Sequence, residues 1–337
     1  MNKRALRFLQ YFIFLGAGLF LVWWQLRSMK PEESEEFVHA LTQSNFKYIL
    51  PVALMSLLSH ISRAMRWKLL MEPLGYRPTL INAFSVTMVG YLANAAVPRL
   101  GEILKCTLLA KYEKLKVDKL VGTIIVERSF DLICFLFFIA ATLFLQFDKV
   151  AVFVRENIHL KTEGVPYWLK PMIVLGALIL IYFLLKRIMQ RYAKVKIIKK
   201  ISGFAHGVAA GFGTIRNLKH RKMFLAHTVF IWSMYLGQIY VGFKGMAGTH
   251  HLEWAAAVSV LTLASLSMIV TPGGIGSFPI FVMETLLLYN IHAPLGKAFG
   301  WLMWGVSTSF IIVFGLLCLL FLPYYNKKKN EINAADS

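Results

Sequence analysis

The chain has 337 residues and a formal net charge of +20, yet 57% of its residues are hydrophobic and only 16% are charged. Apolar runs of about 20 residues recur along the chain, which is typical of an integral membrane protein and excludes an ordinary soluble domain. Most of the 37 Lys and Arg residues fall in segments that the alternation of spans assigns to the cytoplasm. The basic excess is therefore topological and does not indicate nucleic-acid binding, because cytoplasmic loops of membrane proteins are enriched in Lys and Arg.

The N-terminal part of the chain predicts two full crossings. A basic start leads into an apolar run at 6–26. Because no small-residue cleavage site follows this run, we expect a retained helix that leads outward and not a removed signal. An acidic outer loop then leads to an inward span at 46–62, which we expect to end at the cytoplasmic residues Arg63 and Arg66.

A broken pair of apolar segments follows. Residues 81–96 and 103–112 are each short for a clean span, and Pro98 and Gly101 interrupt the sequence between them. A re-entrant hairpin, which enters from the cytoplasm and returns to it, keeps the basic residues that follow on the inside. An outward span is then expected at 120–147.

The second half of the chain has a similar order. An inward span at 171–185 and an amphipathic cytoplasmic linker at 191–222 lead to an outward span at 223–243. A second broken pair is expected to form a hairpin that enters from outside, and a last span returns inward. The two arms of this hairpin and the last span lie at 254–270, 277–289 and 298–322.

This order predicts an all-α integral membrane protein with six full crossings and two re-entrant helical hairpins. Residues 46–147 form a block of span, cytoplasmic hairpin and span, and residues 223–322 form a block of span, outer hairpin and span. The two blocks would be an inverted-topology repeat within one membrane domain that covers residues 1–337. In such repeats two interrupted helices approach each other near the bilayer midplane, where transport sites lie.

Charged residues accompany the first break. Arg99, Glu102 and Lys105 follow one another at spacings of three, so a helix that begins at Gly101 would place them on one face. The N-terminal end of this helix would favour an anion, and Arg99 could add a bidentate contact to a phosphate. The alternative is that Arg99 and Glu102 only neutralise each other within the hairpin.

A second charged group lies inside the span at 120–147. Glu127, Arg128 and Asp131 are roughly 12–18 Å deep at 1.5 Å per residue. Ionisable residues at such depth face the protein interior and are functional candidates. They could form a structural ion pair that fixes this span to the first hairpin, or Glu127 or Asp131 could exchange protons.

The second break carries no charge. Its glycines allow the backbone to approach a ligand or another helix closely. Neither the three Cys nor the nine His residues have the spacing of a metal site, so we expect no metal. The residues of this break are Pro272, Gly273, Gly274 and Gly276.

Three stretches of the sequence resemble the signatures of the lysylphosphatidylglycerol synthase transmembrane family. The resemblance covers nearly the whole chain and implies a polytopic helical domain of the bacterial inner membrane that moves charged lipids between leaflets and uses no soluble cofactor. The order of the spans and basic loops independently predicts that both termini are cytoplasmic. The soluble aminoacyl-transferase domain of the full-length synthases is missing, so the protein is not expected to make aminoacyl lipid itself. Pro279 stands where the glycine motif of the family is often followed by Glu, which puts an acidic role of the second hairpin in doubt. The stretches are Asn94 to Glu102, Glu127 to Asp131 and Pro272 to Gly276.

The leading hypothesis is a lipid translocase, not an enzyme, with a polar cavity between the two hairpins. Its partners would be membrane lipids: an anionic or aminoacylated phospholipid, or a polyprenyl phosphate. A separate synthase or a second copy of the chain could also bind. The residues expected to bind the headgroup are Asn94, Arg99, Glu102, Lys105, Glu127, Arg128 and Asp131, and those expected to shape or gate the breaks are Pro98, Gly101, Pro272, Gly273, Gly274 and Gly276.

Two other functions remain open. An intramembrane lipid or glycosyl transferase could use the paired acids as acid–base groups. A non-catalytic membrane partner of a separate synthase would need neither charged group for its role. The sequence contains no phosphate-cradling Walker motif, so ATP hydrolysis by this chain is not expected.

Overall fold

The computed structural model describes residues 3–97, 99–146 and 218–335, together with a few positions between 169 and 187. This part of the chain is helical and contains no strand. Most of the expected span at 171–185 and most of the linker at 191–222 lie outside the described residues, as does Pro98. Contacts divide the chain into a first unit, Met1–Ile124 with Leu218–Ser337, and a second unit, Ile125–Asn217.

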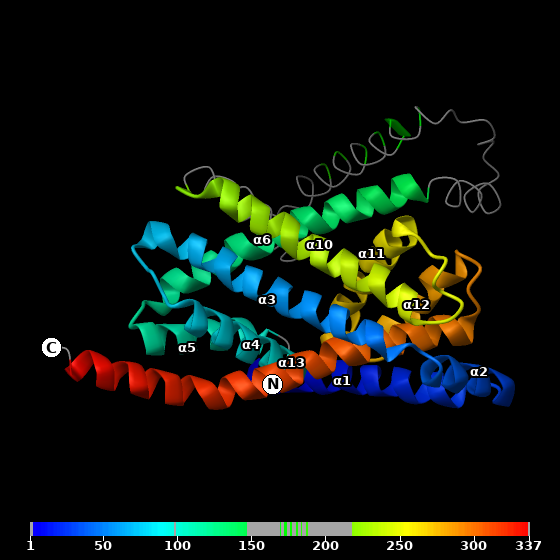
Figure 1. Ribbon diagram of the computed structural model, residues 1–337, viewed down its shortest axis with the longest axis horizontal. Coiled ribbons are helices and arrows are strands. Elements are labelled where there is room, and N and C mark those ends of the chain that lie inside the picture. Colours follow the sequence, from blue (N-terminus) through cyan, green and yellow to red (C-terminus); the bar gives the residue numbers. More distant parts are fainter. Residues whose placement is uncertain are drawn as a thin grey trace. The chain divides into compact units, whose positions relative to one another are not determined.

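The first unit contains two broken helix pairs and the helices that surround them (Figure 1). The pair α4–α5 and the pair α11–α12 lie at the positions where the sequence predicts hairpins. The described helices are α1 (Lys3–Arg27), α2 (Pro31–Thr42), α3 (Ile49–Met71), α4 (Leu80–Ala96), α5 (Leu100–Glu113), α6 (Val117–Leu145, which continues into the second unit), α10 (Arg221–Gly245), α11 (Trp254–Val270), α12 (Ser277–Leu287) and α13 (Ala293–Ala335), with short 3-10 helices η1 (Phe46–Tyr48), η2 (Glu72–Leu74) and η3 (Pro272–Gly274).

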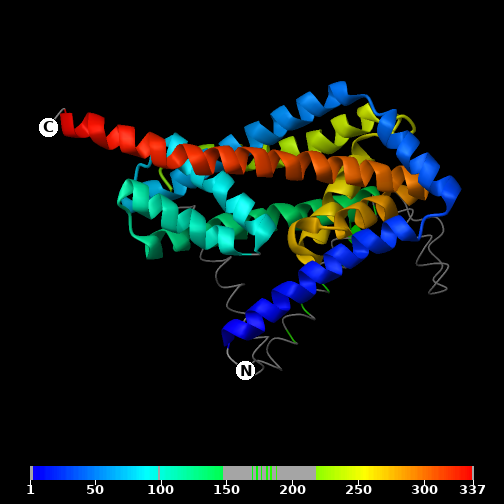
Figure 2. The ribbon, with the colours of Figure 1, turned by 90° about the horizontal axis from the view of Figure 1, so that it is seen from below.

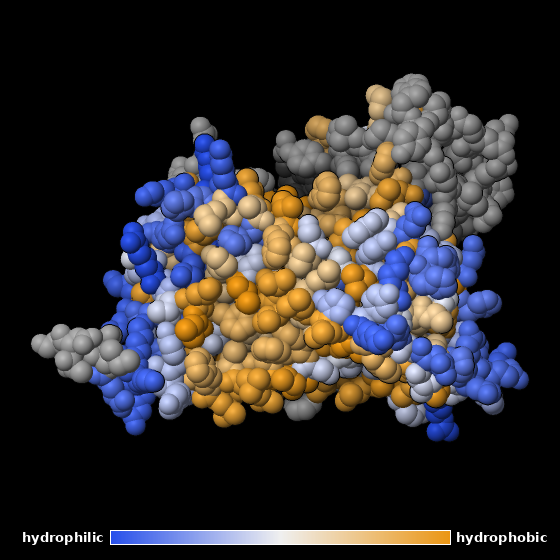
Figure 3. Space-filling view, in the orientation of Figure 1, coloured by the Kyte–Doolittle hydropathy of each residue, from blue (hydrophilic) through white to orange (hydrophobic). Residues whose placement is uncertain are grey.

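Length and composition identify membrane-spanning candidates in this unit. Three described segments are long and apolar enough to cross a bilayer: Phe46–Leu74, Arg221–Gly245 and Ala293–Lys329. The face shown in Figure 3 carries hydrophobic residues across its middle and hydrophilic residues toward the two ends of α13. This distribution fits a helical membrane protein, because lipid tails solvate the apolar band while water and headgroups solvate the ends.

Helix α3 is longer than the sequence predicts. The expected end at residue 62 is wrong, because the helix continues to Met71 and buries both Arg63 and Arg66, which are 5% and 0% exposed. These two residues therefore do not belong to a cytoplasmic loop. The physical reason is tertiary: α3 packs along α10, which supplies hydroxyl groups that accept hydrogen bonds from both guanidinium groups.

The acidic segment after α1 is a helix and not the predicted loop. Pro31 occupies the first turn of α2, where its missing N–H costs nothing, and Glu32 and Glu33 lie in the same turn, where a helix dipole favours acids. Phe37 is buried, and α2 packs against α13. A hydrophobic contact to a distant helix thus stabilises a segment whose charge alone suggested an irregular loop.

Both broken pairs pack against α13, and they approach it from opposite ends (Figures 1 and 2). At the C-terminal side, Asn326 contacts Asn82 near the start of α4, and Gly315 contacts Leu92 near its end. Helix α4 therefore runs antiparallel to α13 and points its broken end toward the middle of that helix.

The second pair reaches the middle of α13 from the other side. Gly300 contacts Pro279 of α12, and the indole Nε1 of Trp304 donates to the carbonyl of Gly273 at 2.9 Å. Helix α4 also contacts η3, which is the break of the second pair. The two breaks are thus brought together along the stretch of α13 between Trp304 and Gly315.

Candidate functional site

The first break is a sharp, tightly held turn. Val97 is extended at the end of α4, and Arg99 adopts a left-handed conformation (φ 67°) immediately before α5. The side-chain Oδ1 of Asn94 accepts a hydrogen bond from the backbone N–H of Gly101 at 2.8 Å. Asn94 therefore satisfies one of the free amides at the start of α5 that an anion would otherwise bind.

Backbone contact between the two arms requires glycine. A Cβ atom at Gly101 would overlap the carbonyl oxygen of Gly90, and one at Gly90 would lie 2.9 Å from the carbonyl oxygen of Gly101. Because any side chain at Gly101 would separate the arms, this glycine fixes where α4 and α5 meet.

The three charged residues of this hairpin do not share one face. Arg99 precedes the helix and is exposed, whereas Glu102 is half-buried in its first turn. Lys105 is 7% exposed and places its Nζ 3.9 Å from the centroid of the Trp67 ring. Its charge is therefore directed toward an aromatic face of α3, where a cation–π interaction stabilises it.

Helices α3 and α10 are joined by polar contacts that the sequence did not predict. Arg63 donates to the hydroxyl of Tyr235, and Arg66 donates to the hydroxyl of Thr228, each at 3.2 Å. Ser62 Oγ lies 2.8 Å from Nδ1 of His227. Sequence reasoning assigned the arginines to a loop, although the apolar residues continue to Met71 and could have indicated a longer helix.

The second break satisfies its own polar groups. Thr271 and Ser277 approach each other with their hydroxyl oxygens 2.6 Å apart, and they donate to the carbonyls of Ile275 and Ser267. Gly273, Gly274 and Gly276 all have positive φ, which explains the glycines at these positions. The break therefore lies where the sequence places it, and its internal hydrogen bonds compensate for the missing helical ones.

Helix α1 packs directly on the second break. A Cβ atom at Gly276 would lie 2.7 Å from the carbonyl oxygen of Gly18, so the two backbones are in contact. Gln25 is 1% exposed, and its Nε2 donates to the carbonyl of Gly276 at 2.8 Å. The side of this break that faces α1 is therefore closed by protein.

Pro279 also has a packing role. A Cβ atom at Gly300 of α13 would lie 2.7 Å from the Cα of Pro279, so α12 and α13 touch there. Pro279 is thus buried against a neighbouring helix. Position 279 therefore contributes packing and no charge to the second hairpin.

The predicted charged group inside α6, Glu127, Arg128 and Asp131, belongs to the second unit. Glu127 is buried, at 2% exposure. Arg128 and Asp131 form the ion pair expected from their spacing, with Nη1 and Oδ2 4.0 Å apart. The Arg128 side chain is 42% exposed, so this long pair contributes little to stability.

A further polar network fixes the base of the first hairpin to the end of α13. Oε1 of Glu113 accepts hydrogen bonds from Thr79 N and Oγ1 and from Asn82 Nδ2, at 2.7 to 3.0 Å. Its Oε2 lies 3.1 Å from Lys329 Nζ, and Asn82 exchanges two amide hydrogen bonds with Asn326. Burial raises the pKa of the Glu113 carboxyl, but the hydrogen bonds from Thr79, Asn82 and Lys329 outweigh it, so the pKa lies below its ordinary value.

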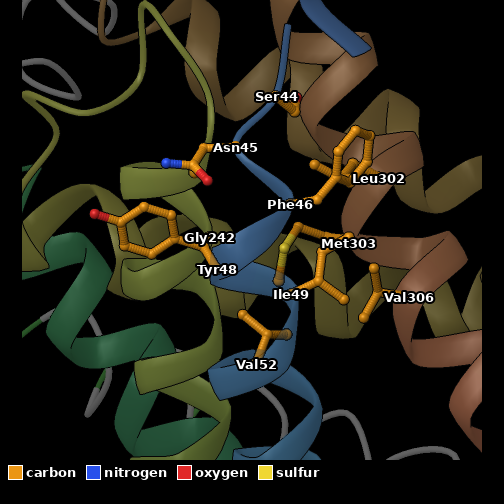
Figure 4. A pocket seen from close by; sticks show the side chains of 11 residues that line it. Ser44, Asn45, Phe46, Tyr48, Ile49, Val52, Gly242, Leu302, Met303 and Val306 are labelled. Carbon is orange, nitrogen blue, oxygen red and sulfur yellow. The ribbon is translucent and has the colours of Figure 1, made fainter. Parts of the chain in front are cut away.

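An apolar pocket that no residue of either break lines lies between the start of α3, the end of α10 and the first half of α13 (Figure 4). Its lining contains no charged side chain, so it does not match the polar cavity expected for a headgroup. No group of three His, Cys, Asp or Glu residues that could hold a metal ion occurs within the described ranges. The pocket is lined by Ser44, Asn45, Phe46, Tyr48, Ile49, Val52, Gly242, Gly245, Leu302, Met303 and Val306.

Comparison with known proteins gives one family and one curated relative. Residues 8–315 match the family model of the lysylphosphatidylglycerol synthase TM region. The UPF0104 membrane protein MJ1595 of Methanocaldococcus jannaschii is 22% identical over 319 residues, which cover 88% of this chain and 91% of the relative. No solved structure matches the chain. The matched range contains both helix breaks and the charged residues of α6.

Proposed function

The chain belongs to the lysylphosphatidylglycerol synthase transmembrane family, and from this premise we propose that it is a lipid translocase. In this proposal, the headgroup of a charged lipid passes between leaflets at the point where the two helix breaks meet, while its tails stay in the bilayer. The family and the apolar helices identify a multi-pass membrane protein. The mode of transport is our inference from the arrangement of the breaks.

The observation that carries the proposal is the meeting of the two breaks on α13. The arms α4, α5, α11 and α12 have 17, 14, 17 and 11 residues. At 1.5 Å per residue even the longest measures about 26 Å, short of a hydrocarbon core of about 30 Å. Arms of this length that approach α13 from opposite ends favour hairpins that re-enter from opposite faces, as in an inverted repeat of residues 46–147 and 223–322.

The basic residues support one orientation in the membrane. Lys114, Lys116 and Lys119 follow the first hairpin, and Glu113 joins that end to Lys329 at the end of α13. Because Lys and Arg are enriched in cytoplasmic loops, we place this end, and with it both termini, in the cytoplasm of a bacterial cell.

Accessibility tests this orientation. A cysteine at Lys116 should react with a membrane-impermeant thiol reagent only from the cytoplasmic side, and one at His250 only from the opposite side. Both positions are exposed. Reaction of both cysteines from the same side would contradict the opposed hairpins.

Arg99 is the residue proposed to meet the headgroup. It is an exposed cation at the first break, so it can pair with a phosphate, while Glu102 can pair with an amine on the same headgroup. Such pairs are strong where water is scarce, which offsets the cost of bringing a charged headgroup into the bilayer. Glu127 and Asp131 are the carboxylates that we propose for coupling to a proton gradient.

Reconstitution in liposomes tests the function. Purified protein should expose a fluorescent phospholipid of the inner leaflet to an impermeant quencher added outside. We expect Arg99→Ala and Glu102→Ala to slow this exposure by tenfold or more, Arg99→Lys to retain part of it, and the control Lys116→Ala to leave it unchanged.

Two results would contradict the proposal. Unchanged translocation by both alanine variants would remove the proposed site. Translocation of no phospholipid by the folded wild type would remove the function, and a change in lipid mass after incubation would instead indicate a transferase.

A further inference from the structure

Helix α1 touches the rest of the first unit along one narrow stripe. Its main contact is with η3, and Figure 2 shows its N-terminal half apart from the other helices of that unit. Between residues 15 and 27 only Gly18 and Gln25 are buried, and their spacing of seven places them on one side of the helix. The large apolar side chains on its other sides are 49% to 58% exposed, so lipid is their natural surrounding. They are Leu19, Phe20, Trp23, Trp24 and Leu26.

The stripe is held by backbone packing and by one hydrogen bond to the break. A Cβ atom at Gly18 would lie 3.1 Å from the carbonyl oxygen of Ile275. Gln25 Nε2 donates to the carbonyl of Gly276 at 2.8 Å and to that of Leu21, in its own helix, at 3.1 Å.

The Gln25 side chain is only half satisfied in this position. Its Oε1 is buried and accepts no hydrogen bond from any residue that the structure describes. A buried acceptor without a partner is unfavourable, which opposes the gain from the bond to Gly276. Gln25 lies two residues before the end of α1 at Arg27, where water and headgroups can hydrogen-bond to it once the helix moves. The contact can therefore open at a small cost.

The second break does not need α1 to keep its shape. Thr271 and Ser277 bond to each other and to carbonyls of the same hairpin. On the side of α13, Trp304 donates to the carbonyl of Gly273. Because these bonds remain when α1 leaves, the break can be uncovered without being unfolded.

We propose that α1 is a lateral gate of the second break. In the arrangement described here α1 covers the break, and movement of α1 into the bilayer opens the break sideways to lipid. A molecule whose tails stay in the bilayer must enter and leave from the side, so a break that α1 covers has to be uncovered during each passage. This inference rests on the proposed function and adds the element that moves.

A disulfide between α1 and the second break tests the gate. A Cβ atom at Gly18 would lie 3.4 Å from the Cβ of Ile275, close to the range of about 3.5–4.5 Å that a disulfide requires. The double variant Gly18→Cys with Ile275→Cys is made in a chain whose own three cysteines are replaced by alanine. The matched control is Met283→Cys with Gly296→Cys, for which the corresponding distance is 3.6 Å and the disulfide joins α12 to α13.

Translocation in liposomes is measured before oxidation, after oxidation and after renewed reduction. Oxidation of the α1 pair should slow translocation by tenfold or more, and reduction should restore it, whereas the control pair should translocate equally in both states. Unchanged translocation with the α1 disulfide formed would overturn the gate and leave the proposed function in place. An equal loss in the oxidised control would also overturn it, because the essential movement would then lie between α12 and α13.

A distance measurement separates the gate from the function. Spin labels at Trp24→Cys of α1 and Ile312→Cys of α13, both exposed, should report a second, longer distance, whereas labels at Leu54→Cys of α3 and Ile312→Cys should report one. Gly18→Leu forces a side chain against the break and should increase the share of the longer distance by twofold or more. Gly16→Leu is the control, because a Cβ atom there meets nothing within 4 Å.

The two kinds of failure are then distinct. A wild type that translocates nothing, but in which Gly18→Leu shifts the distance and Gly16→Leu does not, would contradict only the proposed function. A single, unchanged distance between α1 and α13 in both the wild type and Gly18→Leu would overturn the gate.

Discussion

Removal of the Glu113 carboxylate should release the base of the first hairpin from the end of α13. The carboxylate accepts from Thr79 and Asn82 through one oxygen and pairs with Lys329 through the other. Asn82 is fully buried and is also hydrogen-bonded to Asn326. Without the carboxylate, the amide of Asn82 on α4 and the ammonium group of Lys329 on α13 each lose a hydrogen-bond acceptor.

The magnitude follows from the burial of each partner. Loss of the bonds from Thr79 and Asn82 to a charged acceptor should cost about 2–3 kcal/mol in Glu113→Ala. The ion pair adds at most about 1 kcal/mol, because the Lys329 side chain is 29% exposed and solvent screens it. Glu113→Gln keeps an acceptor oxygen and loses only the charge, so it should cost about 1 kcal/mol.

Unfolding of the purified protein in mixed micelles, followed by circular dichroism, measures these differences. The exposed pair Lys327–Glu331 on the same helix provides the control, because Glu331→Ala removes a local i,i+4 ion pair but no buried hydrogen bond. We expect Glu113→Ala to destabilise the protein most and Glu113→Gln to destabilise it less. Glu331→Ala should be as stable as wild type. Equal stability of Glu113→Ala and Glu331→Ala would refute the reasoning.

The pH dependence follows from the lowered pKa of Glu113. A carboxyl whose folded-state pKa lies below its ordinary value of 4.5 stabilises the protein fully above that pH. This contribution is lost as the pH falls through the lower, folded-state pKa. Wild type should therefore lose more stability on acidification below about pH 4.5 than Glu113→Gln, which carries no titrating group at this position.

Two glycine substitutions test the helix breaks against matched controls. Gly101→Ala should destabilise the first hairpin by about 2 kcal/mol or more, because the added Cβ overlaps a backbone oxygen. In the control Gly122→Ala the added Cβ meets open space, so this substitution should not destabilise the protein. Unfolding in mixed micelles compares the two variants. Gly276→Ala should be more destabilising than Gly75→Ala, because both glycines have positive φ but only Gly276 contacts Gly18 of α1. Equal thermal stabilities of the two variants would show that the contact with α1 contributes nothing to the stability of the protein.

The sequence predicted the breaks well because their causes are local. A Pro and several Gly residues interrupt apolar runs at the first and second breaks, and no neighbour can restore a straight helix through left-handed Arg99 or Gly276. The arms were also placed closely: α4 and α11 begin and end within a residue of the predicted bounds, 81–96 and 254–270. The presence of a helix and the position at which it breaks can therefore be predicted from the types of neighbouring residues in the sequence.

Other features of the structure could not be predicted from neighbouring residues in the sequence. The end of α3 was misplaced because a basic residue after an apolar run usually marks a membrane boundary, whereas Arg63 and Arg66 bond to residues of α10 more than 160 positions away. The network around Glu113 joins residues that are individually unremarkable and are up to 244 positions apart. Pro31 and the acidic first turn of α2 are sequence signals for the start of a helix. No sequence signal indicated that this helix packs against α13.

By itself, the sequence determined the class of protein, the positions of the helices and the two places where a helix must break. These depend on hydrophobicity, charge and backbone conformation, which each residue carries with it. Only the tertiary structure decided that both broken pairs pack on α13 from opposite ends and that α4 contacts the second break. That arrangement depends on contacts such as Gly300 with Pro279 and Gly315 with Leu92, in which shape complementarity between distant segments fixes the packing.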